Sequence, residues 1–166
     1  IGAAYMAQLA AKKAAWDRDE AFLVGLLHDV GELHLLRLAR DYERCYHVPV
    51  ANDDLADVMA TEHAGLGASM LIAWEFPRKL AEIALYHHDP LSTRTNHAET
   101  AVIYLADRLC RRYGFGCTAT DPSLKDPRSL LDDPHCTRLN LTEEWLHDID
   151  AVAPGLRSEE HTSELQ

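Results

Sequence analysis

The chain has 166 residues, of which 47% are apolar and 26% charged, and its 27 acidic and 16 basic side chains leave a formal net charge of −11. These proportions are ordinary for a globular domain with its own core and argue against disorder. No apolar run approaches the roughly 20 residues of a membrane-spanning helix. The acidic balance is also a poor match for the phosphate backbone of duplex nucleic acid. We therefore expect one acidic domain, with neither membrane nor duplex nucleic acid as partner.

Helical signals follow one another along the chain, and no alternating strand pattern competes with them. Asp17 or Asp19 can cap the second predicted helix, Gly31 marks the turn after it, and Val48-Pro49 ends the third. Helices are predicted over residues 1–15, 20–30, 32–46, 52–60, 63–74, from 77 onward, 96–113 and 143–152. The predicted fold class is all-α, as a single helical bundle.

Hydrophobic spacing predicts which sides of these helices face inward. Leu66, Met70 and Trp74 recur at helical spacing after His63 and predict one buried stripe. The helix over 96–113 is apolar almost all round, a pattern expected of a central buried helix. The stretch over 118–139 looks irregular, and Pro154-Gly155 is predicted to end the last helix.

Both ends of the chain have unusual sequences. Residues 157–166, RSEEHTSELQ, resemble the translation of a sequencing-adapter oligonucleotide, so we interpret them as a non-native tail. The first residues already read as the middle of a helix, which suggests a fragment of a larger protein. We expect a helical core over 1–113, then an irregular segment and a C-terminal helix over 114–156 that pack on it.

The four cysteines form no C-x-x-C pair. We interpret them as free thiols of a cytoplasmic protein, because nothing in the sequence indicates an oxidising compartment. Cys45 and Cys110 lie in helical, largely apolar patterns and are expected to be small core residues.

Several ionisable side chains lie at positions that the helical pattern turns inward. His28 and Asp29 project from a predicted helix that is otherwise apolar on most faces, and His63 begins the predicted stripe. His87 and His88 extend the stripe of Leu80, Ile83 and Ala84. A buried carboxylate is costly unless it is paired or binds a metal ion. The candidate metal ligands are His28, Asp29, His63, His87, His88 and Asp107.

Imidazole and carboxylate ligands suit divalent cations such as Mn, Fe or Mg, and the absence of thiolates from the set disfavours a structural zinc site. Two such ions can activate a bridging water and hold a phosphate oxygen. A core histidine held by hydrogen bonds explains each residue taken alone, and a buried His-Asp pair can satisfy itself. The residues leave both interpretations open.

Four motifs carry a resemblance to a known family. GLLHDVG (25–31), EHAGLGASMLIAWEFP (62–77), IALYHHDP (83–90) and YLADRLC (104–110) resemble, in this order, the HDOD domain, the HD-related output domain of bacterial signalling proteins. The W-x-x-P element at 74–77 separates this family from the catalytic HD-GYP phosphodiesterases. The resemblance covers about residues 1–113. It implies an HD-superfamily helical bundle and a regulatory role beside other signalling modules.

The resemblance also bears on the site residues. It places His28 and Asp29 at the HD pair, Asp107 at the distal Asp, and the other three histidines at the extra positions of two-metal relatives. Three departures weaken an enzymatic interpretation. The superfamily's first metal histidine would fall just before Ile1, Glu32 stands where catalytic HD-GYP members commonly have Lys, and DPLSTRTN (89–96) lacks the Gly-Tyr-Pro motif.

Two hypotheses follow. The first is a regulatory HDOD module whose surface transmits a state to an attached domain or a partner signalling protein, with the polar cluster as a structural or metal-binding centre. The alternative is a metal-dependent phosphohydrolase or cyclic-dinucleotide phosphodiesterase with a small phosphate ligand, in which Asp29 also orients the attacking water.

Overall fold

The computed structural model describes residues 1–115 and 121–163, without the side chains of 154 and 157–163. No strand occurs in this part of the chain, so the predicted all-α class is confirmed. The α-helices are α1 (Gly2–Ala10), α2 (Arg18–Leu27), α3 (Val30–Tyr46), α4 (Asn52–Ala73), α5 (Arg78–Tyr86), α6 (His97–Tyr113), α7 (Arg128–Leu131) and α8 (Glu143–Ser163). Four short 3-10 helices lie at Ala11–Ala14, Pro90–Ser92, Pro122–Lys125 and Thr137–Leu139.

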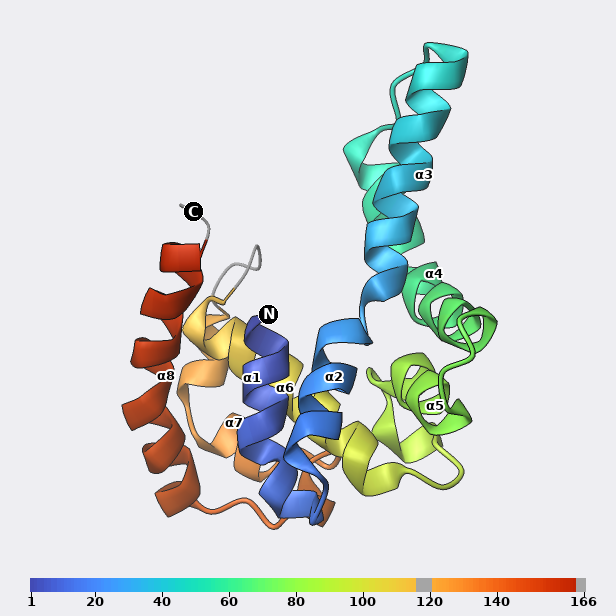
Figure 1. The fold of residues 1–166 in the computed structure, drawn as a ribbon. Coiled ribbons are helices and arrows are strands. Elements are labelled where there is room, and N and C mark those ends of the chain that lie inside the picture. The colour runs from blue at the N-terminus through green and yellow to red at the C-terminus, as the bar shows by residue number, and fades with distance from the viewer. Residues whose placement is uncertain (116–120, 164–166) are drawn as a thin grey trace.

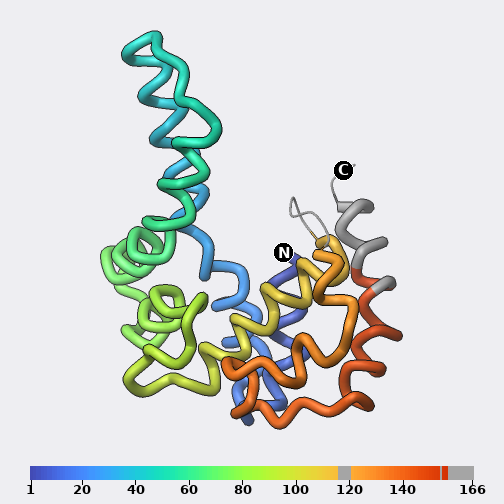
Figure 2. The backbone as a smooth tube through the Cα atoms, turned by 180° about the vertical axis from the view of Figure 1, so that it is seen from behind, coloured from blue at the N-terminus to red at the C-terminus, as the bar shows by residue number. Residues whose placement is uncertain are grey.

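Helix α6 is the centre of the body, as its all-round apolar pattern predicts. Its side chains Val102, Ile103, Leu105 and Leu109 are fully buried, and it contacts α1, α2 and α5. Each such side chain contributes about 1.5–3 kcal/mol of hydrophobic free energy when it leaves water. Helix α8 lies at the end of the body opposite α5 (Figures 1 and 2). The body is therefore organised around one buried helix.

Helix α3 and the first half of α4 project from this body as an antiparallel hairpin (Figure 1). We call residues 32–62 the arm. None of its side chains is buried, and large apolar groups such as Leu33, Tyr42 and Tyr46 are exposed. The helices of the arm were predicted from the sequence, but their separation from the core was not.

Two predicted helix boundaries are wrong. Helix α2 ends at Leu27 rather than near Val30, so that His28 and Asp29 form the break before α3. The predicted helices over 52–60 and 63–74 are one continuous helix, α4. The chain needs no break there because the residues between the two predicted helices, Thr61 and Glu62, lie on the exposed side of the helix.

The predicted buried stripe on α4 is also wrong. Trp74 is 51% exposed, and the buried residues are His63, Gly67, Ala68 and Leu71. The inward side of α4 is selected by the space available against α3, where small residues permit a close approach. Side-chain size alone therefore pointed to the wrong side of the helix.

The chain after α6 packs on the body. Leu124, Leu130 and Leu139 are buried, and the Tyr104 hydroxyl of α6 donates a hydrogen bond of 2.8 Å to Asp133. Helix α8 continues through Pro154 and Gly155 to Ser163, so the predicted stop is wrong. The predicted irregular stretch contains three short helices in its described part, 121–139.

The cysteines divide between core and surface. Cys110 is buried, as predicted, but Cys45 is exposed because its stretch of α3 lies in the arm. Cys136 is a buried free thiol, and burial raises its pKa to about 12. Cys117 lies outside the described residues.

Candidate metal centre

The His28-Asp29 pair lies where α2 gives way to α3. The Asp17 side chain caps the start of α2, and His28 follows its last residue. Nδ1 of His28 lies 2.9 Å from the carbonyl oxygen of Gly25, one of the last carbonyls of α2, which have no helical partner. This bond turns Nε2 of His28 away from the helix and toward Asp29, which stands before the first turn of α3.

Gly31 brings α4 to this junction. A Cβ atom at position 31 would lie 2.0 Å from the carbonyl oxygen of His63 and 2.8 Å from the backbone nitrogen of Gly67. Only glycine leaves room for so close a helix crossing. The crossing places the imidazole of His63 beside Asp29, with Nε2 3.7 Å from Oδ1.

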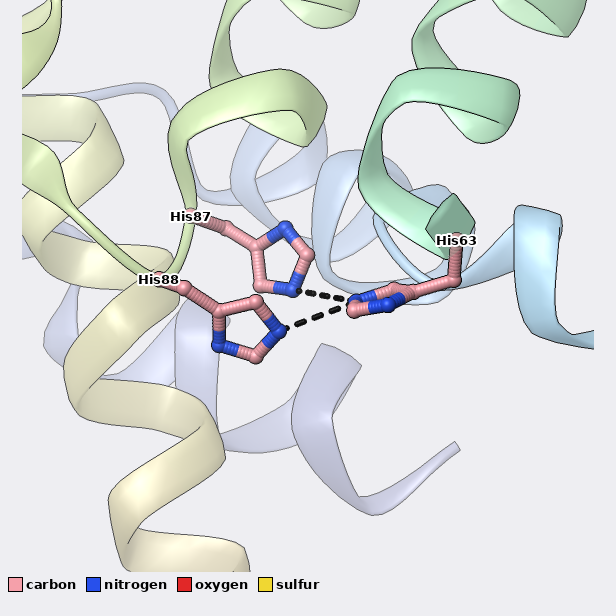
Figure 3. A group of neighbouring side chains, drawn as sticks. All are labelled: His63, His87 and His88. Carbon is pink, nitrogen blue, oxygen red and sulfur yellow. Dashed lines mark hydrogen bonds between the residues drawn. The ribbon is translucent and has the colours of Figure 1, made fainter. Parts of the chain in front are cut away.

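Helix α5 supplies the remaining histidines. His87 follows the last residue of α5, and its Nδ1 lies 2.7 Å from the carbonyl oxygen of Ala84, in the same local arrangement as His28. Nε2 of His63 lies 3.4 Å from Nε2 of His87 and 2.9 Å from Nε2 of His88. Figure 3 shows the three imidazoles pointing toward one another.

The backbone contacts define the proton positions on three of the rings. His28, His63 and His87 each place Nδ1 against a carbonyl oxygen, at 2.9, 2.5 and 2.7 Å respectively. A carbonyl only accepts hydrogen bonds, so Nδ1 carries the proton and Nε2 the lone pair in the neutral ring. The same use of a backbone carbonyl orients histidine ligands in metal sites.

Asp29 is the point on which these lone pairs converge. Its carboxylate oxygens lie 2.8 Å from Nε2 of His28 and 3.2 Å from Nε2 of His87. Nε2 of His28 is buried and lies outside hydrogen-bonding geometry. A proton on Nε2 of His28 would remove the repulsion between this nitrogen and Asp29, but the lone pairs of His63 and His87 would still face the carboxylate. A cation among these atoms would remove all of these repulsions at once.

The pKa shifts of Asp29 and His88 favour their ligand forms at neutral pH, whereas that of His28 favours the protonated ring. Burial opposes ionisation of Asp29, but the adjacent His28 and His87 rings outweigh it and hold its pKa well below the usual range. Burial and the neighbouring His87 and His63 lower the pKa of His88 to about 4. Burial opposes protonation of His28 too, but the adjacent Asp29 carboxylate outweighs it and raises the pKa. Asp29 is thus ionised and His88 neutral, as metal binding requires.

Five of the six predicted ligands come together, with one addition. Within each of three groups, one donor atom per residue lies within 4.8 Å of the others. The groups are His63, His87 and His88; His28, Asp29 and His87; and Asp29, Glu32 and His63. Their imidazole and carboxylate donors, without thiolate, fit a divalent cation such as Mn, Fe or Mg.

Glu32 was missed as a candidate ligand. In the sequence, Glu32 drew attention only as the residue that stands where catalytic HD-GYP members commonly have Lys. It follows Asp29 by three residues, which places both side chains on one side of the helix start, and this spacing was the available signal. Burial and the nearby Asp29 raise the pKa of Glu32.

Asp107 is the predicted ligand that belongs to none of the three groups. Its carboxylate lies 3.0 Å from the Arg111 guanidinium, one turn along α6. Both residues line a cavity of about 330 Å³ with Asp29, Glu32 and His88. Asp107 therefore faces the centre across this cavity. His88 is half exposed to the same space, so it is not at the inner end of α5 as expected.

An all-α body with a His-Asp pair at a helix break, faced by three histidines, defines an HD-type helical domain. The family model of the HDOD domain matches residues 1–90, more than half of the chain, and the chain belongs to this family. A search of curated proteins and a search of solved structures found no match. No helix in the described ranges has the length and apolar character needed to cross a membrane.

Proposed function

We propose that this chain is a regulatory HDOD module of a bacterial, cytoplasmic signalling protein, and that a divalent metal ion stabilises its HD junction. The observation that carries the proposal is the convergence of the Nε2 atoms of His28, His63 and His87 on the Asp29 carboxylate. These donors come from three segments, the α2–α3 junction, α4 and the end of α5. Binding there would tie the base of α3 and α4 to the body. The partner in this proposal is an attached domain or a second signalling protein.

The ligands would be His28, Asp29, His63 and His87, with Glu32 and His88 completing the set. A divalent ion held there would supply positive charge and a water of lowered pKa. Asp29 belongs to two of the three donor groups and would serve both. The carbonyl oxygens of Gly25, Met59 and Ala84 would hold the rings of His28, His63 and His87 in their orientations.

The wall of the neighbouring cavity favours a regulatory role over phosphoester hydrolysis. Asp29, Glu32 and Asp107 contribute three carboxylates, and Arg111 is already engaged by Asp107. Without a bound ion, a phosphate anion would meet these carboxylates at short range, where like charges repel strongly. A bound divalent ion would offset the charge of Asp29 and Glu32 but not that of Asp107. Hydrolysis of a small phosphoester remains the alternative, because His88 and Arg111 line the same cavity.

The test is elemental analysis of the full chain, expressed with Mn and Fe supplied. We expect at least one equivalent of metal in the wild-type chain and its loss in His63→Ala. His34→Ala is the matched control: His34 lies on α3, outside the three donor groups, and this variant should retain the metal. Less than about a tenth of an equivalent in the wild type would overturn the proposed metal centre.

Chelation and activity measurements complete this test. Because a ligand that binds only the folded state stabilises it, metal at 100 times its Kd adds about 2.7 kcal/mol to the free energy of unfolding. Chelation should remove this increment from the wild type and from His34→Ala but leave His63→Ala unchanged. Metal-dependent turnover of cyclic dinucleotides or model phosphodiesters, abolished in Asp29→Asn, would establish the alternative.

A further inference from the structure

The cavity of about 330 Å³ beside the candidate metal centre is lined by more acidic than basic side chains. Asp29, Glu32 and Asp107 contribute carboxylates to its wall, and Arg111 contributes a guanidinium group. His88 lines the same cavity but is neutral at neutral pH, because burial and the neighbouring histidines lower its pKa to about 4. Three negative charges and one positive charge leave these side chains with a net charge of −2 when the carboxylates are ionised. A single divalent ion is enough to cancel this charge.

Arg111 reaches this cavity from the central helix α6, together with Asp107. The two residues are one helical turn apart, so they lie on the same side of the helix, and their charged groups are 3.0 Å apart. The side chains of Arg111 and Asp107 are 41% and 21% exposed, and the Nε atom of Arg111 is buried without a hydrogen bond to a described residue. An arginine side chain keeps its positive charge in a protein. The pair therefore places a permanent cation at the cavity wall, facing the metal centre.

The charges of this pair act on the candidate ligands across the cavity. Burial is the largest cause of the low pKa of His88, and the positive charge of Arg111 lowers that pKa further. Burial is also the largest cause of the raised pKa of Glu32, and the negative charges of Asp29 and Asp107 add to it. Such effects arise only between charges that lie close together. Without Arg111, the donor atoms of Glu32, His88 and Asp107 would line a cavity of higher negative charge.

We infer that Arg111 is a resident cation that limits the centre to one divalent ion. The inference rests on the proposed metal centre and deepens it, because it names the residue that determines how many ions bind. A second ion would draw on the donors of Glu32, His88 and Asp107, which are of the types that divalent cations accept. The guanidinium of Arg111 opposes such an ion in two ways. It repels a second cation, and it engages the Asp107 carboxylate that this ion would need.

Calorimetric titration of the metal-free full chain with Mn²⁺ tests this inference, because it measures the number of ions that bind. We expect one Mn²⁺ per wild-type chain and two per chain of Arg111→Gln, which keeps a polar side chain but removes the positive charge. Arg111→Lys retains the charge and should bind one Mn²⁺. Asp107→Asn combined with Arg111→Gln removes a carboxylate as well as the cation, so this double variant should return to one ion.

The matched control is Arg44→Gln. Arg44 forms a comparable contact with Asp41, at 3.1 Å on α3 and outside the cavity, so this variant should bind one Mn²⁺. Circular dichroism checks that each variant remains helical. The inference is overturned if Arg111→Gln binds one ion or none, or if either Arg111→Lys or the double variant binds two. A wild-type chain that binds two ions also overturns it but leaves the proposed metal centre intact, whereas a wild-type chain that binds none overturns both.

Discussion

The same pair of helices, α3 and α4, packs in two different ways along its length. At the base, Gly31 meets the backbone of His63 and Gly67 so closely that no side chain fits between them. In the arm, the two helices diverge around a groove, and Leu38 and Tyr42 remain half exposed. The base brings candidate metal ligands together, whereas the arm leaves apolar side chains exposed.

The two ends of α3 therefore lie in different surroundings, with candidate metal ligands at its start and exposed side chains at its end. Asp29 and Glu32 lie at the start of the helix in the candidate metal centre, and Tyr46 ends it at the tip of the arm. A continuous helix connects them, so a change in the orientation of its base would move its tip. The base and the arm should therefore respond differently to substitution, and the following variants test that difference.

Gly31→Ala should have the largest effect. The added Cβ would lie 2.0 Å from the carbonyl oxygen of His63, so α3 and α4 must separate. We expect a loss of at least about 4 kcal/mol in the free energy of unfolding, together with loss of bound metal. Urea unfolding and elemental analysis measure the two effects.

Gly65→Ala is the control on the same helix pair. A Cβ at position 65 meets nothing within 4 Å, and the residue lies inside α4. Because alanine is the better helix former, this variant should gain up to about 1 kcal/mol and retain its metal. Equal destabilisation by the two substitutions would contradict the close crossing at the base.

Leu71→Ala and Leu36→Ala extend the comparison to the apolar side chains. Leu71 is 1% exposed at the base, whereas Leu36 is 43% exposed on the arm, outside its groove. The buried substitution leaves a cavity and should cost about 2–5 kcal/mol, and the exposed one less than about 1 kcal/mol. Thermal unfolding at one protein concentration compares them. A cost at Leu36 as large as that at Leu71 would mean that this side of the arm is covered.

Much of the centre could be predicted from the sequence. His28, Asp29, His63 and His87 follow from ionisable residues at inward helical positions, because burial without a partner is costly. Glu32 was signalled only by its three-residue spacing from Asp29, and the break after Leu27 decides which side chains of the next turn face the centre. Asp107 lies on the predicted helix, but the choice between Arg111 and an ion depends on side-chain rotamers, which a helical pattern leaves open.

The fold was predictable to a similar degree. The central helix α6 is apolar on nearly every side, so its burial follows from the sequence alone. The inward side of α4 does not, because Leu66, Met70 and Trp74 form the stronger apolar stripe while Gly67 and Ala68 are buried. The close crossing at Gly31 selects small residues, and such long-range contacts are invisible in local periodicity. The arm was missed for the same reason.

Glu82→Gln should have a smaller effect on the free energy of unfolding than Leu71→Ala. Together with Glu43→Gln, it compares a loop of the body with the turn of the arm. The Glu82 carboxylate accepts hydrogen bonds from the backbone nitrogens of Arg94 and Thr95, at 2.9 and 3.2 Å, and from the Thr95 hydroxyl and the Asn96 amide, at 2.8 and 2.6 Å. In the arm, the Glu43 carboxylate accepts a hydrogen bond from the backbone nitrogen of Val50 at 2.9 Å.

The Glu82 carboxylate should therefore couple stability to pH. Burial slightly opposes ionisation of Glu82, but the hydrogen bonds from residues 94–96 outweigh it and lower its pKa. Its contribution is thus present above the unfolded pKa of about 4.3 and is lost as pH falls through the lower folded pKa. At pH 7, Glu82→Gln should cost about 1 kcal/mol or less, because the site is exposed. Glu43→Gln should cost still less. Urea unfolding at pH 7 and pH 3 measures both, and a Glu82→Gln cost that stays the same at pH 3 would contradict the ionised hydrogen-bonded carboxylate.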